Sequence, residues 1–157
     1  MTKATLLFLL REDEILLAMK KRGFGAGKWN GTGGKVEPGE SIEHAALREC
    51  QEEIGVTPLD PRQFGVLQFD MADDPTFQSE VHIFVAHAWQ GQPHETEEMR
   101  PKWFKTSEIP YYDMWSDDKF WLPLLLAAQS FEGHFTLTTA GTLVHHHLKK
   151  VSQLGLN

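Results

Sequence analysis

The stretch GGKVEPGESIEHAALRECQEEIGV, from Gly33 to Val56, constrains the fold of this chain more than any other segment. A glycine-rich loop leads through a Pro-Gly turn into a segment rich in good helix formers. The pattern predicts a helix from Ser41 to Ile54, capped by Ser41 or Glu40 and ended by Gly55. A loop followed by a helix therefore anchors the predicted fold.

Three glutamates crowd into the second half of this helix, at Glu49, Glu52 and Glu53. Because they are spaced i, i+3 and i+4, they share one face, whereas another face suits core packing through Leu47, Cys50 and Ile54. Close like charges destabilise an isolated helix unless a cation neutralises them. A hard divalent cation such as Mg²⁺ prefers these oxygen ligands, and a solvated acidic face is the alternative.

The rest of the chain predicts one α/β domain over residues 1–157, with a mixed sheet flanked by two main helices. A second helix is expected after Ser116, with Pro123 either kinking it or marking its start. Strands are predicted at 4–10, 14–20, 64–71 and 81–89, with an extended segment over 101–110 and a final hairpin of 131–137 and 142–148.

Composition limits the partners. The 157 residues include 15 Lys and Arg against 22 Asp and Glu, a net charge of −7, which argues against a nucleic-acid polymer. The apolar run ATLLFLL is far shorter than the roughly 20 residues of a membrane span. Cys50 is the only cysteine, so no internal disulfide can form. We expect a cytoplasmic monomer with no membrane partner.

The run His145–His147 lies between Val144 and Leu148. Such a run can bind metal, but alternating positions on a strand are the favoured interpretation.

The spacing of fixed residues from Gly34 to Val56 resembles the Nudix box, the signature of hydrolases that act on nucleoside diphosphates linked to another group. The matching positions are Gly34, Glu40, Arg48, Glu49, Glu52, Glu53, Gly55 and Val56, with Cys50 at a position that usually holds Ile, Leu or Val. The resemblance implies the Nudix fold, a mixed sheet sandwiched between helices (α/β/α) with a catalytic loop–helix–loop.

The resemblance also implies roles for these residues. Mg²⁺, or Mn²⁺ as a substitute, would be held by Glu49, Glu52 and Glu53 with the backbone carbonyl of Gly33, and Glu98 is a further candidate ligand. Arg48 would form a salt bridge with Glu40. A glutamate close to a metal-bound water can accept its proton, and we expect Glu53, then Glu52, to be this base.

Three stretches outside the box, RGFGAGKWNG, EEMRPKWF and DMWSDD, resemble the oxidised-purine branch of the MutT homologues within this family. That branch implies Mg²⁺-dependent hydrolysis of nucleotides such as 8-oxo-dGTP and 2-hydroxy-dATP to the monophosphate and pyrophosphate, which cleanses the nucleotide pool. It implies that Asn30, Asp117 and Asp118 contact the base and that Lys20 and Lys35 face the triphosphate. Further substrate-binding candidates are Thr5, Phe24, Thr32, Gly33, Gly34, Phe69, Met99, Trp115, Ser116 and Trp121.

The residue chemistry agrees with this resemblance, although each residue has an ordinary structural interpretation as well. Trp115 can stack on a purine or belong to the core. Asp117 and Asp118, pressed together, would leave one carboxyl protonated, or they simply form the acidic first turn of a helix. Asn30 can bind a base edge or serve as a turn residue. Thr32 departs from the branch, which usually has a bulky apolar residue there, so we expect its smaller, polar side chain either to loosen the base pocket or to alter which oxidised base fits.

Other functions stay open from the sequence. A Nudix hydrolase of an unmodified dNTP, ADP-ribose or a dinucleoside polyphosphate is one alternative, and a non-catalytic nucleotide-binding domain is another. The segment 71–81 also departs from the branch, and we predict that it forms a hairpin loop at the mouth of the pocket.

Overall fold

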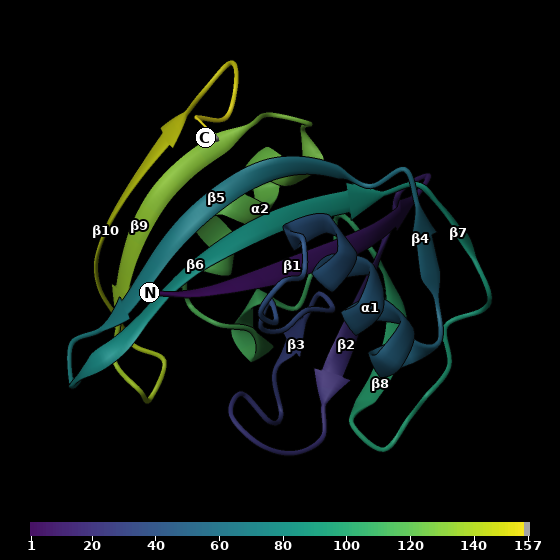
Figure 1. Cartoon of the computed structure of the whole chain (residues 1–157), viewed down its shortest axis with the longest axis horizontal. Coiled ribbons are helices and arrows are strands. Elements are labelled where there is room, and N and C mark those ends of the chain that lie inside the picture. Colours follow the sequence, from purple (N-terminus) through teal and green to yellow (C-terminus); the bar gives the residue numbers. More distant parts are fainter. Residues whose placement is uncertain (156–157) are drawn as a thin grey trace.

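The computed structural model describes residues 1–155 and contains one mixed eight-stranded sheet with helices on both of its faces (Figure 1). The strand order is β10-β9-β5-β6-β1-β2-β3, with β8 paired to β2; β1–β6 and β5–β9 are parallel and the other pairs antiparallel. The elements are β1 (Thr2–Arg11), β2 (Glu14–Lys20), β3 (Trp29–Asn30), α1 (Ile42–Ile54), β4 (Thr57–Leu59), β5 (Arg62–Met71), β6 (Asp74–Ala86), β7 (Ala88–Gln90), β8 (Met99–Lys105), a 3-10 turn (Tyr111–Asp113), α2 (Asp118–Leu126), β9 (Phe131–Leu137) and β10 (Leu143–Lys150). The predicted mixed sheet between helices is confirmed.

Alternating side chains on the central strands create two cores. On β1, Leu7 and Leu9 face α1, where they pack with Cys50 and Ile54, whereas Phe8 faces α2 and packs near Trp121. Successive residues of a strand point to opposite faces, so a continuous apolar run can serve two helices at once. This alternation explains why the N-terminal run is apolar without a polar side.

A divergence between β1 and β2 makes room for the site. The two strands pair only next to their hairpin turn, at Leu10–Ile15 and Arg11–Glu14. Farther along β1, the glycine-rich loop takes the place of β2, through isolated bridges of Ala4 with Lys35 and Leu7 with Thr32. The loop after β3 is thereby held against the middle of β1, directly beside α1.

Several predicted boundaries are corrected. The hairpin predicted at 71–81 is present, but its loop is shorter than that segment: β5 ends at Met71, only Ala72 and Asp73 form the turn, and Phe77 lies in β6. The strand predicted at 81–89 is interrupted at His87, after which β7 pairs with β4. In α2, Pro123 lies inside the helix, which begins at Asp118.

Within residues 1–155, no helix combines the length and the apolar character needed to cross a membrane.

Candidate active site

The start and end of α1 follow the predicted capping pattern. The side-chain oxygen of Ser41 accepts a hydrogen bond from the His44 N–H at 3.1 Å, which satisfies one of the unpaired donors at the N-terminus. Gly55 ends the helix with φ = 76°, a left-handed conformation that glycine adopts without steric cost. Ser41 and Gly55 therefore set the two ends of α1, and Glu49, Glu52 and Glu53 lie in its last turns.

Arg48 forms the centre of a polar network between the helix and the preceding loop. Its guanidinium makes a bidentate pair with Glu40, with N···O distances of 2.7 and 2.9 Å, and also donates to the carbonyl of Lys35. This pair lowers the pKa of Glu40 to about 2. The predicted Arg48–Glu40 salt bridge is present, and its planar geometry suits fixing the loop against the helix.

The same guanidinium contacts two of the three clustered glutamates. It donates to Glu49 at 2.9 Å and to Glu52 at 3.3 Å. Glu52 is 59% exposed and Glu49 only 17%, although sequence spacing predicts that both lie on one face. Arg48 therefore offsets part of the repulsion within the cluster.

Glu53 lies in the most enclosed environment of the three glutamates, and it is 5% exposed. Its carboxylate accepts the backbone N–H of Gly33 at 2.8 Å. The pKa of Glu53 is raised from 4.5 to about 8, chiefly by burial, and the charges of Glu49 and Glu98 add to the rise while the Gly33 hydrogen bond opposes it. A carboxyl with this pKa takes up and releases protons close to neutral pH.

The two glycines before the helix make this close approach possible. A Cβ atom on Gly33 would lie 1.8 Å from the carbonyl oxygen of Thr5, and one on Gly34 would lie 2.6 Å from the carboxyl carbon of Glu49. No larger residue fits at either position without a shift of β1 or of the carboxylate. The glycine pair therefore brings backbone and carboxylates together.

Glu98 belongs to the same electrostatic group although it comes from the loop before β8. Its charge contributes to the raised pKa of both Glu49 and Glu53, for each of which burial is the main cause. The side chain is 56% exposed, and its nearest cation is Arg22, at 3.9 Å.

The donors here suit a hard divalent cation. No three His, Cys, Asp or Glu side chains within the described chain converge as a complete metal cage. Mg²⁺ does not need one, because it usually binds one or two carboxylates, several waters and the substrate phosphates. Glu49 and Glu53, whose pKa values are raised mainly by burial and further by neighbouring carboxylates, supply that partial set of oxygen ligands.

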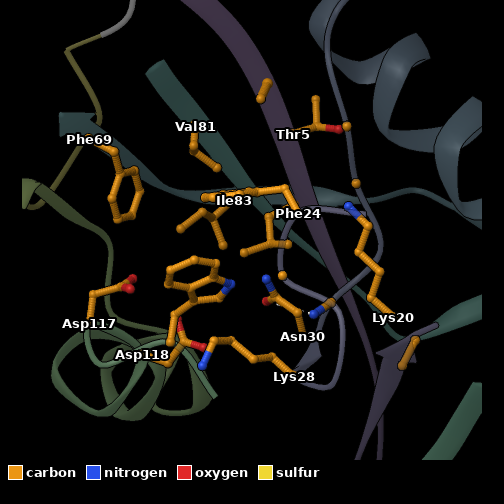
Figure 2. Close-up of a pocket in the computed structure, with 18 of the residues that line it drawn as sticks. Thr5, Lys20, Phe24, Lys28, Asn30, Phe69, Val81, Ile83, Asp117 and Asp118 are labelled. Carbon is orange, nitrogen blue, oxygen red and sulfur yellow. Dashed lines mark hydrogen bonds between the residues drawn. The ribbon is translucent and has the colours of Figure 1, made fainter. Parts of the chain in front are cut away.

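A cavity of about 300 Å³ opens beside these carboxylates, between the glycine-rich loop and α2 (Figure 2). Asp117 and Asp118 lie on one side of it and Lys20 on the other. Predicted substrate-site residues that line the cavity are Thr5, Lys20, Phe24, Asn30, Gly33, Gly34, Phe69, Met99, Trp115, Asp117, Asp118 and Trp121, together with Glu53. A single cavity thus joins the candidate base site to one of the clustered glutamates.

Asp117 and Asp118 are almost completely buried, at 3% and 2% exposure. Asp117 stands at the N-cap of α2, but its side chain makes no capping bond and instead accepts the Trp121 indole N–H at 2.8 Å. Burial raises the pKa of both carboxyls, that of Asp118 well above 3.8, and the neighbouring Asp117 charge adds to the rise. Asp118, with the larger rise, therefore holds a proton more readily than Asp117; the sequence predicts a raised pKa for one of the two.

Within the part of the chain that the structure describes, two buried side-chain oxygens lack a hydrogen-bond partner, Asp118 Oδ2 and Thr5 Oγ1, and both residues line the cavity. Asn30 uses its side-chain oxygen to accept the Gly31 N–H at 2.9 Å, which leaves the amide nitrogen for another partner. Since buried polar groups are nearly always paired, unpaired ones that face a cavity indicate the places where a ligand makes hydrogen bonds.

Aromatic rings form the mouth of the cavity. Trp115 lies 5.1 Å from Phe24, and Phe24 lies 6.4 Å from Phe77, measured between ring centroids. The Lys28 ammonium is 5.2 Å from the Trp115 ring. These rings offer flat apolar surfaces to a planar ligand.

Three predicted substrate residues do not line the cavity. The hydroxyl of Thr32 donates to the Leu7 carbonyl at 3.4 Å on the α1 side of the sheet, so the expectation that it loosens the base pocket is wrong. Ser116 donates to the carbonyl of Gly141 at 2.7 Å, which secures the loop that backs Trp115. Lys35 is exposed outside the cavity.

Sequence reasoning did not single out Phe77, Lys28 or the strand residues Val81 and Ile83, which all line the cavity. The alternation of Val81 and Ile83 on β6 is a signal for an inward face. Phe77 gave no such signal, because its segment looks like a loop.

The fold and the site together place the chain in a family of hydrolases. A NUDIX domain model matches residues 1–125, and the chain therefore belongs to the Nudix family, whose hydrolases generally use a divalent metal ion.

Known proteins similar to this chain cover nearly its whole length. It is 46% identical over 147 residues to the oxidized purine nucleoside triphosphate hydrolase of Mus musculus, covering 94% of each chain. It is 45% identical over 150 residues to the Danio rerio protein of the same name, covering 96% of each. The crystal structure of a mutator MutT protein from Bacillus halodurans matches with a TM-score of 0.85 at 27% identity, over 94% of this chain and 97% of that one.

Proposed function

We propose that the protein is a Mg²⁺-dependent pyrophosphohydrolase that converts oxidised purine nucleoside triphosphates, such as 8-oxo-dGTP and 2-hydroxy-dATP, and water into the monophosphate and pyrophosphate. The observation that carries this proposal is the buried Asp117–Asp118 pair, which faces the same cavity as Asn30 and Glu53. The names of the relatives from Mus musculus and Danio rerio support the same substrate class.

The pair can read a base edge because its two members differ in protonation. A neutral Asp118 carboxyl donates, Asp117 accepts, and the Asn30 amide nitrogen adds a second donor. Oxidation of guanine at C8 adds a carbonyl oxygen and places a proton on N7, so that a donor and an acceptor become neighbours. Buried hydrogen-bonding groups of this kind discriminate strongly against ligands that leave them unpaired.

At the other end of the cavity, we assign the hydrolysis of the triphosphate to the clustered glutamates and Lys20. Glu53, held by the Gly33 N–H, would accept the proton of the attacking water, and the Lys20 ammonium would attract the phosphates. Gly33, Glu49, Glu52, Glu53 and Glu98 are the candidate ligands among which a divalent cation would find its few protein oxygens, and it would neutralise phosphate charge and acidify a bound water. Arg48, through its pair with Glu40, would hold the preceding loop against the face of α1 that contains the glutamates.

We also propose that residues 1–157 form one domain acting as a cytoplasmic monomer. All the groups named above come from a single chain, and its net charge of −7 does not favour a nucleic-acid polymer as partner.

A substrate panel tests the proposal. With Mg²⁺ present, we expect the kcat/KM for 8-oxo-dGTP and 2-hydroxy-dATP to exceed that for dGTP, ADP-ribose and diadenosine tetraphosphate, with monophosphate and pyrophosphate as products on anion-exchange chromatography. A protein that hydrolyses dGTP or ADP-ribose as efficiently as the oxidised nucleotides would contradict the substrate assignment.

Removal of metal should separate binding from chemistry. In EDTA, hydrolysis should fall to background and recover on addition of Mg²⁺ or Mn²⁺, because the carboxylates alone only add to phosphate repulsion. Binding of 8-oxo-dGMP, followed by quenching of tryptophan fluorescence, should persist in EDTA, since Asn30, Asp117 and Asp118, which would contact the base, are not metal ligands. Hydrolysis that continues in EDTA would refute a metal-dependent mechanism.

A further inference from the structure

The loop between β7 and β8, residues 91–98, includes the candidate metal ligand Glu98 and is hydrogen-bonded to α1 at Glu53, another candidate ligand. It passes the C-terminal end of α1 and leads into β8, beside β2 (Figure 1). It contains Glu98 but no regular strand, so its conformation depends on individual contacts.

Two residues of the loop bond the end of α1: the His94 backbone N–H donates to the Ile54 carbonyl at 3.1 Å, and Thr96 bonds Glu53 through its side chain. The Thr96 hydroxyl donates to the backbone carbonyl of Glu53 at 2.8 Å and accepts the Met99 N–H at 3.2 Å. The Thr96 backbone N–H donates to the Met99 carbonyl at 2.9 Å. Since the last carbonyls of a helix have no partner within it, the Thr96 hydroxyl satisfies one of them and joins α1 to the first residue of β8.

Lys21 holds the loop from the opposite side. Its backbone N–H donates to the Glu98 carbonyl at 2.8 Å, and its ammonium donates to the Thr96 carbonyl at 2.7 Å and pairs with Glu95. Lys21 directly follows Lys20, which lines the cavity. The backbone on either side of Glu98 is therefore tied to both α1 and the end of β2.

The side chain of Glu98 has no comparable support. It is 56% exposed, and its contact with Arg22 spans 3.9 Å. What places this carboxylate near Glu53 is the backbone of its loop, and the direct connection between that loop and Glu53 is the Thr96 hydroxyl.

We propose that Thr96 is a positioning residue that sets the separation of Glu98 and Glu53, and that Lys21 supports it by clamping the same loop. The proposal rests on the proposed function, in which both carboxylates bind the divalent cation. Thr96 itself touches neither metal nor nucleotide in this assignment and acts through the backbone.

Two substitutions at Thr96 test this role. Thr96→Val keeps the shape and removes the hydroxyl, whereas Thr96→Ser keeps the hydroxyl. The matched control is Thr57→Val, which removes a hydroxyl at the same end of α1 that donates to the Gln51 side chain at 2.8 Å; Thr57 pairs with Gln90 of β7 and not with Thr96 or Glu98. Lys21→Met, at an exposed position, removes the ammonium contacts while the backbone bond to Glu98 stays.

The readout is the affinity for Mn²⁺ alone, measured by the electron paramagnetic resonance of free Mn²⁺ without nucleotide. Thr96→Val should weaken it by about 10- to 100-fold, as is typical when a partner of a metal ligand is removed. Lys21→Met should weaken it to a smaller extent, and Thr96→Ser and Thr57→Val should leave it unchanged. The affinity for 8-oxo-dGMP in EDTA should be the same in all variants.

Unchanged Mn²⁺ affinity in Thr96→Val overturns the proposal, and so does an equal loss in Thr96→Val and Thr57→Val, which would indicate general weakening of the helix end. If Thr96→Val does not fold, the Mn²⁺ affinity of Lys21→Met decides by itself. Unchanged affinity in that variant would show that holding the loop does not position Glu98, and would overturn the proposal. If the wild-type protein binds Mn²⁺ but does not hydrolyse oxidised purine nucleotides, the proposed function is wrong, while the Mn²⁺ affinities of the variants still test the role of Thr96.

Discussion

Replacement of Glu53 by Gln should lower kcat for 8-oxo-dGTP by about 10²–10⁴-fold, the usual contribution of a positioned general base. The carboxylate lies 5% exposed in the cavity wall with a pKa raised to about 8, mainly by burial, which matches a group that exchanges protons near neutral pH. Gln keeps the shape and can still accept the Gly33 N–H through its amide oxygen. The loss should therefore be in chemistry rather than in folding.

Glu52→Gln is the matched control for this prediction, because Glu52 is one residue away and is 59% exposed. Its kcat should fall much less than that of Glu53→Gln, and Mn²⁺ affinity measured on both variants separates loss of a ligand from loss of a base. Full activity of Glu53→Gln, or a larger loss in Glu52→Gln, would show that the base has been assigned to the wrong residue.

The part of the site that sequence could predict is local. The caps of α1 follow from the local residue types, and the Arg48–Glu40 pair is what the family resemblance of the same segment implies; the structure contains all of them. The helical period alone groups the three glutamates together. It does not say that Glu53 is buried against Gly33 while Glu52 is in solvent, because that difference depends on how the loop packs on β1.

The predictions that failed concern residues whose positions depend on strands that are distant in the sequence. Thr32 points to the α1 side because β1 and β2 diverge and the loop pairs with Leu7, which no local pattern signals. Phe77 lies in β6 because the hairpin extends to Ala72 and Asp73, although Asp, Pro and Thr in this segment are typical of a loop. Thr96 carries no motif, and its role depends on the end of a helix 43 residues earlier.

Replacement of Asp118 or Asp117 by Asn should reduce kcat/KM for 8-oxo-dGTP on the order of 10²-fold, while Mn²⁺ affinity stays at the wild-type value. A hydrogen bond that involves a charged group contributes about 1.5–3 kcal/mol, and an amide cannot reproduce the division of one proton between two carboxyls. Asp113→Asn is the control, since Asp113 is exposed on the neighbouring 3-10 turn. Steady-state kinetics on the three variants provides the measurement.

The pH dependence of stability shows whether such a loss comes from a damaged fold. The folded pKa of Asp118 is raised well above its ordinary 3.8, so its contribution to stability is fully present below about 3.8 and is lost as pH rises through the raised value. Asp118→Asn cannot ionise, and its urea midpoint should therefore drop less than that of the wild type between pH 5 and pH 8. Asp117 is also buried with a raised pKa and is still present in the variant, so part of the drop in the urea midpoint remains.

Low turnover combined with a higher urea midpoint at pH 8 is the expected result for Asp118→Asn. It would mean that the wild-type site sacrifices stability to keep a carboxyl with an unpaired oxygen in its wall, as functional sites often do. Wild-type turnover of 8-oxo-dGTP by both Asn variants would reject the pair as the reader of the base. In that case the preference would have to come from Asn30 and the aromatic rings at the mouth of the cavity.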